Sequence, residues 1–116
     1  LDRAVVSTAR RARQTWELVA AELGDAAPPV RVSEAAYTFD GEELLGVVRK
    51  LPESLTHVAL VGHNPAIEEL VELLTGRWVA MPTSALAIIE LDDWATADRG
   101  SGRLVKAGRP ADGHLD

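Results

Sequence analysis

The sequence predicts an α/β fold, with a mainly parallel sheet and helices on its faces. Short apolar segments rich in β-branched residues occur at 4–6, 58–61 and 85–91. Between them lie longer segments whose apolar residues repeat at helical spacing. Turn-forming residues separate the two kinds of segment. This alternation of strand and helix is typical of parallel strands joined by crossover helices.

The most informative segment runs from Val58 through Gly62-His63-Asn64-Pro65. The run 58–61 predicts a buried strand. Asn64 is expected to be the N-cap of a following helix, and Pro65 its first residue. The apolar face of that helix would comprise Ile67, Leu70, Val71 and Leu74, with Gly76 as its stop. His63 would then stand at the carboxyl end of a strand and at the start of a helix, where ligands and anions bind in open α/β sheets.

A second informative segment begins with the strand 4–6, which ends at Ser7. A helix is expected from Thr8 or Ala9 to Leu23, with Gly24 as its stop. Its buried stripe would consist of Ala12, Trp16, Val19 and Leu23. Its first turns carry three cations, Arg10, Arg11 and Arg13. Cations at this end oppose the helix dipole, so a bound anion would compensate them. An isolated cluster of this kind is more often a solvated basic face, but this one follows the carboxyl end of a strand, as His63 does, so the two could face one crevice.

The remaining elements complete one domain, residues 1–106, followed by a polar tail, 107–116. A short edge strand is expected at 30–32, with irregular structure over 33–39. Asp40 and Glu43 have the spacing of a capping box for a helix whose apolar residues are Leu44, Val47, Val48 and Leu51. A connection, 77–84, leads to a buried strand at 85–91. A turn and a polar loop then precede a strand at 103–106, hairpinned to the previous one.

Other polar residues give weaker signals. Glu34 follows the edge strand and could donate or accept a proton, but a surface carboxylate is as good an interpretation. His57 and His63 would lie about 20 Å apart on an extended strand, so they cannot share a metal ion. His114 falls in the tail. We therefore expect no metal site and no cofactor.

Composition excludes several classes of function. The chain has 116 residues, a formal net charge of −6 and no cysteine. The charge argues against nucleic-acid and anionic-membrane partners, and the missing cysteines exclude disulfides and thiolate chemistry. No apolar run approaches the roughly 20 residues of a membrane span, and the first residues do not resemble a signal peptide. A cytoplasmic protein is expected.

The motifs Ser7-x-x-x-Arg11-x-x-Gln14-Thr15 and Val61-Gly62-His63-Asn64-Pro65 give the chain a resemblance to the histidine phosphatase superfamily. It looks most like the SixA-type phosphohistidine phosphatases. The resemblance covers roughly residues 2–91. It implies a three-layer α/β/α fold of the phosphoglycerate mutase type and phosphoryl transfer without a metal, through a phosphohistidine enzyme intermediate.

The resemblance also implies roles for individual residues. Arg11 matches the phosphate-binding arginine, and His63 matches the second histidine, which stabilises the transferring phosphoryl group. Ser7 and the backbone N–H of Asn64 are expected to contribute to phosphate binding. Glu34 lies where some members carry the acidic proton donor.

The family's nucleophilic histidine belongs to an Arg-His-Gly or Arg-His-Ala motif in the first, central strand, and these 116 residues lack it. A preceding segment or another chain is therefore expected to complete the sheet, because an open central edge is unstable and prone to aggregation. The expected function is removal of a phosphoryl group from phosphohistidine in a protein or from a small phosphate ester. The alternatives are a non-catalytic phosphate-binding or regulatory module, and a mutase or sugar-phosphate phosphatase.

Overall fold

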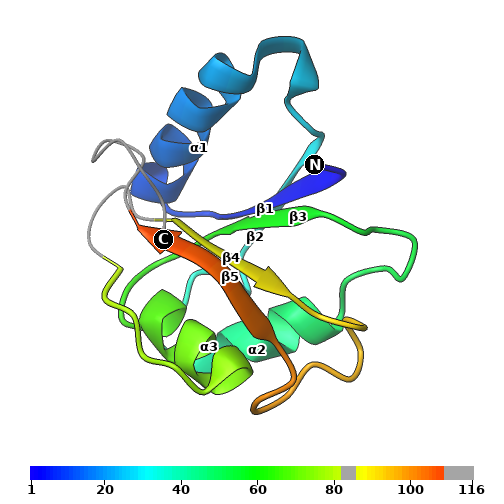
Figure 1. Ribbon diagram of the computed structural model, residues 1–116. Helices are drawn as coiled ribbons and strands as arrows, with labels where there is room; N and C mark the ends of the chain where they lie inside the picture. Colours follow the sequence, from blue (N-terminus) through cyan, green and yellow to red (C-terminus); the bar gives the residue numbers. More distant parts are fainter. Residues whose placement is uncertain (82–85, 109–116) are drawn as a thin grey trace.

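The computed structural model describes residues 1–81 and 86–108 (Figure 1). Its elements, in chain order, are β1 (Arg3–Ser7), α1 (Arg10–Leu23), the 3-10 turn η1 (Gly24–Ala26), β2 (Val30–Ser33), α2 (Gly41–Arg49), β3 (Val58–Val61), α3 (Ala66–Thr75), β4 (Leu86–Glu90) and β5 (Arg103–Gly108). The expected order of strands and helices is confirmed. Strand β5 includes Ala107 and Gly108, which the sequence analysis had assigned to the tail; the rest of the tail, with His114, lies outside the described residues.

A three-stranded parallel sheet of order β2-β1-β3 forms the centre of the molecule. In its register, Val5 of β1 lies beside Arg31 of β2 and Leu60 of β3. The carboxyl ends of the strands, at Ser7, Ser33 and Val61, therefore meet at one edge of the sheet. This edge is where an open parallel sheet presents a ligand site.

At the opposite end of the sheet, where the strands begin, Asp2 links β1 to the residues before β3. Its carboxylate accepts hydrogen bonds from the N–H of Thr56 at 2.7 Å, the N–H of His57 at 3.0 Å and the hydroxyl of Thr56 at 2.8 Å. These bonds favour the charged form and lower the pKa of Asp2 to about 2. The start of β1 is thereby tied to the residues that lead into β3.

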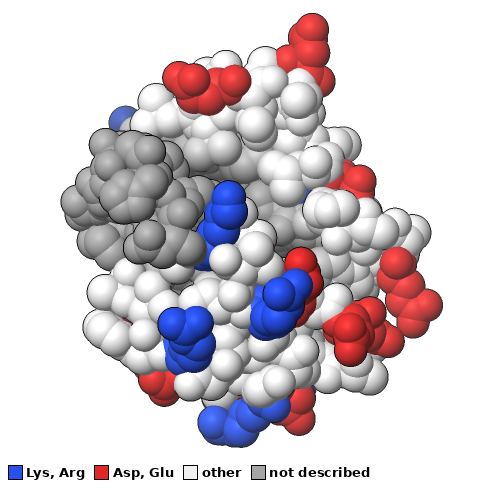
Figure 2. Space-filling model, in the orientation of Figure 1, with Lys and Arg blue, Asp and Glu red and all other residues white. Residues whose placement is uncertain are grey.

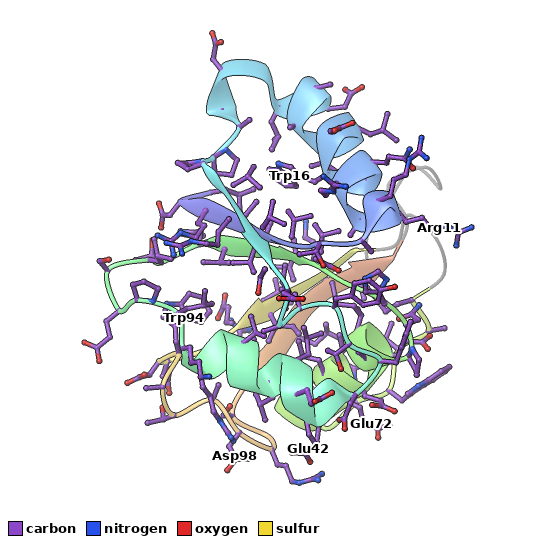
Figure 3. The ribbon with its side chains drawn as sticks, turned by 180° about the vertical axis from the view of Figure 1, so that it is seen from behind. Arg11, Trp16, Glu42, Glu72, Trp94 and Asp98 are labelled. Carbon is purple, nitrogen blue, oxygen red and sulfur yellow. The ribbon has the colours of Figure 1, made fainter. Side chains whose placement is uncertain are left out.

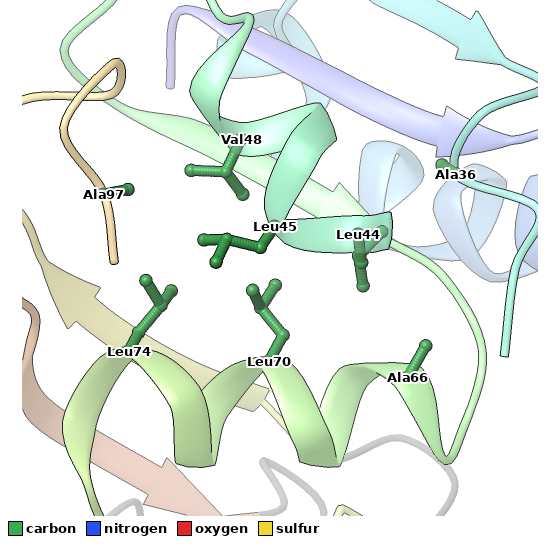
Figure 4. Packing of buried hydrophobic residues seen from close by; sticks show 8 residues of the cluster. All are labelled: Ala36, Leu44, Leu45, Val48, Ala66, Leu70, Leu74 and Ala97. Atoms are coloured by element: carbon green, nitrogen blue, oxygen red, sulfur yellow. The ribbon is translucent and has the colours of Figure 1, made fainter. Parts of the chain in front are cut away.

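Helices lie on both faces of the parallel sheet and give three layers (Figure 1). On one face, α1 packs Ala12 and Trp16 against Ala4 and Val6 of β1. On the other face, α2 and α3 pack together and against Leu60 of β3 (Figure 4). The buried residues of this second cluster are Ala36, Leu44, Leu45, Val48, Ala66, Leu70, Leu74 and Ala97.

The buried stripe of α1 differs from the expected one at Val19, which is 41% exposed. Ala20 packs against the cluster instead, together with Leu23. The residues of α1 in this cluster lie at positions 12, 16, 20 and 23, so their spacings are four, four and three residues. Such spacings place them on one narrow stripe of the helix. Val19 lies beside that stripe and remains exposed.

The start of α2 is capped, but not by the expected capping box. The carboxylate of Asp40 accepts a hydrogen bond from the N–H of Glu42 at 2.8 Å, so Asp40 is the N-cap. Glu43 does not return to the N–H of Asp40; it accepts a bond from the hydroxyl of Thr38 at 2.6 Å. The N–H of Asp40 donates instead to Thr38 Oγ1 at 3.1 Å. The buried Thr38 thus completes the cap.

The start of α3 also differs by one residue from the prediction. The N-cap is Pro65, and Asn64 lies before it. The side-chain amide of Asn64 donates to the carbonyl of Met81, so it does not cap the helix. At the other end, Gly76 ends α3 in the left-handed conformation with φ 73°, as expected.

Strands β3 and β4 are less buried than the sequence analysis expected. All four residues of β3 are half-buried, and Ile88 of β4 is 41% exposed. Among the described residues, β3 pairs only with β1, while β4 forms a separate antiparallel pair with β5. Each of the two strands therefore keeps one edge without a strand partner in the described ranges.

The β4–β5 hairpin presents charges of both signs. In the view of Figure 2, Lys and Arg side chains lie over the middle of this face, and Asp and Glu side chains lie mostly around its margin. Arg103 of β5 pairs with Glu90 of β4. In the described ranges no helix is long and apolar enough to cross a lipid bilayer.

Candidate active site

His63 and Ser7 meet at the carboxyl edge of the parallel sheet. His63 follows β3, Ser7 ends the neighbouring β1, and Ser7 Oγ lies 2.8 Å from His63 Nε2. Ser7 is fully buried, and its Oγ also accepts a hydrogen bond from the N–H of Ala9 at 3.2 Å. With that N–H as donor, the serine hydroxyl can donate its own proton to Nε2, which leaves the proton of the imidazole on Nδ1. Nδ1 is then the nitrogen that can donate to a ligand oxygen.

The start of α1 lies directly beyond Ser7 and carries unusual charges. Its N-cap, Ala9, makes no side-chain capping bond, and its first turn contains no acidic residue. Arg10, Arg11 and Arg13 are all exposed there. Figure 3 shows Arg11 projecting from the first turn at the end of the sheet. Free N–H groups, the helix dipole and a guanidinium together favour an anion at this point.

Two aromatic rings from the loop between β2 and α2 flank His63. The ring of Tyr37 lies 5.1 Å from the His63 ring, centroid to centroid, at an angle of 33°. The ring of Phe39 lies 5.7 Å away at 58°. His63 is half-buried and therefore has solvent on part of its surface. The three rings therefore lie together at the candidate site.

The side chains of two expected site residues make no hydrogen bond to His63 among the described residues, although the role expected of Asn64 involves its backbone N–H, which directly follows His63. The carboxylate of Glu34 is exposed at the start of the loop, and the carbonyl of the residue accepts the N–H of Tyr37 at 3.0 Å. Asn64 is also exposed, and its amide turns to Met81. In the described residues, the side-chain contact among the expected site residues is Ser7 with His63. Arg11 and Glu34 lie at the same end of the sheet without a side-chain hydrogen bond to either of them.

A separate groove of about 370 Å³ lies between α2 and the strands β1 and β2. Arg3, Arg31 and Lys50 line it, and His63 and Ser7 do not. In the described ranges, no group of three or more His, Cys, Asp or Glu side chains could hold a metal ion. His57 lies at the opposite end of β3 from His63, next to Asp2.

Sequence reasoning missed Tyr37 and Phe39, because residues 33–39 had been interpreted only as irregular. A signal was present: these are the one tyrosine and the one phenylalanine of the whole chain, two positions apart. Small residues, Ala36 and Thr38, alternate with them. The composition thus marked these two rings, but it did not indicate that both would be exposed beside His63.

The fold is similar to that of two solved phosphohistidine phosphatase structures. The structure of a protein assigned as phosphohistidine phosphatase SixA, from Nakamurella multipartitia, superimposes with a TM-score of 0.73 at 26% identity, covering 94% of this chain and 70% of that one. The protein histidine phosphatase SixA complexed with tungstate gives a TM-score of 0.74 at 26% identity, covering 98% of this chain and 72% of that one. The chain has the SixA fold. The resemblance to the histidine phosphatase superfamily is thus confirmed in three dimensions.

A further relative adds sequence similarity without a function. The uncharacterized protein ML1117 of Mycobacterium leprae is 26% identical over 116 residues, which cover 90% of this chain and 69% of that protein. No protein-family model matches the chain. The SixA fold, with its mixed α/β architecture and parallel sheet, therefore carries the assignment, and it supports a phosphatase function.

Proposed function

We propose that the chain is the phosphoryl-binding part of a histidine phosphatase. The reaction is removal of a phosphoryl group from phosphohistidine in a protein, or from a small phosphate ester. The observation that carries the proposal is the Ser7–His63 hydrogen bond at the carboxyl edge of the sheet, beside an uncapped helix start that bears Arg11. The two SixA neighbours support it, since one is complexed with tungstate, a tetrahedral oxyanion like phosphate.

In this proposal the substrate phosphoryl group lies between Arg11 and His63. The guanidinium of Arg11 and the Nδ1–H of His63 donate hydrogen bonds to the phosphoryl oxygens. Backbone N–H groups near Ala9 and Asn64 add to the positive electrostatic potential at the phosphoryl group. Positive groups fixed around a phosphoryl group in transit stabilise the transition state more than the ground state. Glu34 would supply a proton to the leaving group once its exposed side chain turns toward the site.

The chemistry needs a nucleophilic histidine, which we place outside these 116 residues. Its ring nitrogen attacks phosphorus, a P–N bond to the enzyme forms, and the bond to the leaving group breaks as that group takes a proton. Water then attacks phosphorus, the P–N bond breaks, and inorganic phosphate leaves. His63 is already engaged by Ser7, and His57 lies at the far end of β3. Within residues 1–81 and 86–108, β3 and β4 each have one edge without a strand partner, which supports a further strand beside His63.

Anion binding by the chain tests the phosphoryl site directly. We expect tungstate and orthophosphate to bind, with perturbation of the His63 ring signals in NMR spectra. Arg11→Ala should weaken binding roughly tenfold, as expected for the loss of one charge-assisted contact. Arg13→Ala, an equally exposed arginine on the same helix, is the matched control and should change affinity little. Equal losses in both variants would show that only general positive charge matters.

Turnover separates this proposal from a non-catalytic phosphate-binding module of the same fold. The 116-residue chain by itself should release no measurable phosphate from a phosphohistidine peptide. The complete gene product should do so if the residues encoded before Leu1 contain a strand followed by Arg-His-Gly or Arg-His-Ala. Phosphorylation of the chain itself at His57 or His63 would contradict the role that we propose for His63.

A further inference from the structure

The phosphoryl transfer proposed above uses neither ring of the aromatic pair beside His63. We propose that Tyr37 and Phe39 form a subsite that binds an aromatic leaving group of the substrate while the phosphoryl group lies at Arg11 and His63. This inference deepens the proposed function and rests on it. It assigns selection between ring-bearing and aliphatic phosphoryl compounds to two named residues.

The position and exposure of the two rings support a ligand-binding role. Tyr37 is 53% exposed and Phe39 is 59% exposed, although both contact the His63 ring region. The Tyr37 and Phe39 rings stand edge to face, with centroids 6.3 Å apart and planes at 89°. Edge-to-face pairs leave ring faces and edges open to a third ring. A chain with one tyrosine and one phenylalanine thus places both, partly in solvent, beside its candidate catalytic histidine.

The loop that carries Tyr37 and Phe39 is held in place by the buried residues that alternate with them. Ala36 is fully buried in the α2–α3 cluster, and its N–H donates to the carbonyl of Ser33 at 3.3 Å. Thr38 is buried and bonds both to Glu43 and to the N–H of Asp40. Ala36 and Thr38 are buried, whereas Tyr37 and Phe39, which alternate with them, are exposed. The rings are therefore positioned before a ligand arrives, which lowers the entropic cost of binding.

The alternative is that the two rings only shield the imidazole of His63 from water. Shielding needs apolar area but no particular ring geometry, so leucine would serve as well as an aromatic residue. A subsite for rings depends on aromatic faces and edges, and the ring–ring component is lost on substitution by leucine. Only the subsite role predicts that an aromatic ligand binds more tightly than an aliphatic one and that leucine at position 37 or 39 removes this difference.

The experiment compares two probes, phenylphosphonate and methylphosphonate, at a pH where both are dianions. Their affinities for the chain are measured by titration calorimetry or NMR. We expect phenylphosphonate to bind roughly three- to tenfold more tightly, from the aromatic contact. In Tyr37→Leu and Phe39→Leu the ratio of the two affinities should fall toward one. Leu18→Ala, an exposed apolar residue on α1, is the control and should keep the ratio of the parent chain.

The possible results are distinguishable from a failure of the proposed function. If methylphosphonate and orthophosphate bind but phenylphosphonate has no advantage, the aromatic subsite is wrong and the phosphoryl site stands. A phenyl advantage that survives both leucine variants, in samples whose circular dichroism matches the parent, also overturns it. If none of the three anions binds, both proposals fail together.

Discussion

At the scale of single residues, Ser7 connects the parts of the candidate site. Its hydroxyl lies at the end of β1, accepts the N–H of Ala9 at the start of α1 and contacts Nε2 of His63 after β3. A buried hydroxyl with two partners has little freedom to rotate, so it determines which nitrogen of the imidazole carries the proton. The orientation of His63 thus depends on a residue that need not touch the ligand.

The tautomer of His63 provides a test of this arrangement. In the parent chain we expect neutral His63 to carry its proton on Nδ1, because Ser7 donates to Nε2. Ser7→Ala removes that donor, and the ring should shift toward the Nε2–H tautomer that predominates in free histidine. Nitrogen-15 chemical shifts of the imidazole, recorded in alkaline solution, report the ratio directly.

His57 is an internal control in the same spectrum. It lies at the opposite end of β3, where its Nδ1 is 3.0 Å from Thr56 Oγ1. Its tautomer should not respond to Ser7→Ala. An unchanged His63 ratio in a folded Ser7→Ala chain would mean that the serine accepts from Nε2–H instead of donating.

At the scale of elements, the contact between α2 and α3 depends on Gly41. A Cβ at this position would lie 2.4 Å from the Cβ of Glu69 and 3.1 Å from the N of Leu70, so α3 would have to move. Gly46, also in α2, has nothing within 4 Å of such an atom. A Cβ would therefore clash at Gly41 but would have free space at Gly46.

Alanine substitutions of these glycines should have opposite effects on stability. Gly46→Ala should raise the free energy of unfolding by about 0.5–1 kcal/mol, because alanine loses less backbone entropy in a helix. Gly41→Ala should lower it by roughly 1–3 kcal/mol, the usual cost of overpacking. Urea unfolding followed by circular dichroism measures both. Stabilisation by both substitutions would show that α3 adjusts to a Cβ at position 41 without cost.

The sequence predicted the elements well because their signals are local. The strand at 58–61, the stop at Gly76 and the N-cap at Asp40 follow from residues within a few positions of one another. The errors concern contacts between distant residues. The hydrogen bond from the Asn64 side chain to the Met81 carbonyl spans 17 positions, and no pattern in the sequence around Asn64 predicts it.

The candidate site could be predicted only in part, for the same reason. Ser7 and His63 could be placed at one edge because parallel strands align their carboxyl ends. The approach of Tyr37 and Phe39 to His63 depends on how the loop 34–39 folds over the sheet. That path is set by the burial of Ala36 and Thr38 against α2, a tertiary effect that periodicity alone does not reveal.

At the scale of the whole molecule, the described strands form two sheets instead of one. Strand β1 has neighbours on both sides, whereas β3 and β4 each have one. The α2–α3 cluster nevertheless contacts both sheets, since Leu60 of β3 and Ile89 of β4 pack against it. A common core thus holds β3 and β4 on one body, each with an edge unpaired among the described strands, which is a favourable arrangement for accepting a further strand.

Amide hydrogen exchange should detect the open edge of β3. In a strand paired on one side, successive N–H groups point alternately to the partner and away from it. We therefore expect alternating slow and fast exchange over Val58–Val61 in dilute, monomeric chain. The amides of Ala4–Val6 in β1 should be slow throughout, because the strand has partners on both sides. Slow exchange at every residue of β3 in such a sample would mean that another segment of the chain already covers this edge. A strand from outside the 116 residues would then have no place beside His63, and the nucleophile would have to reach it by another route.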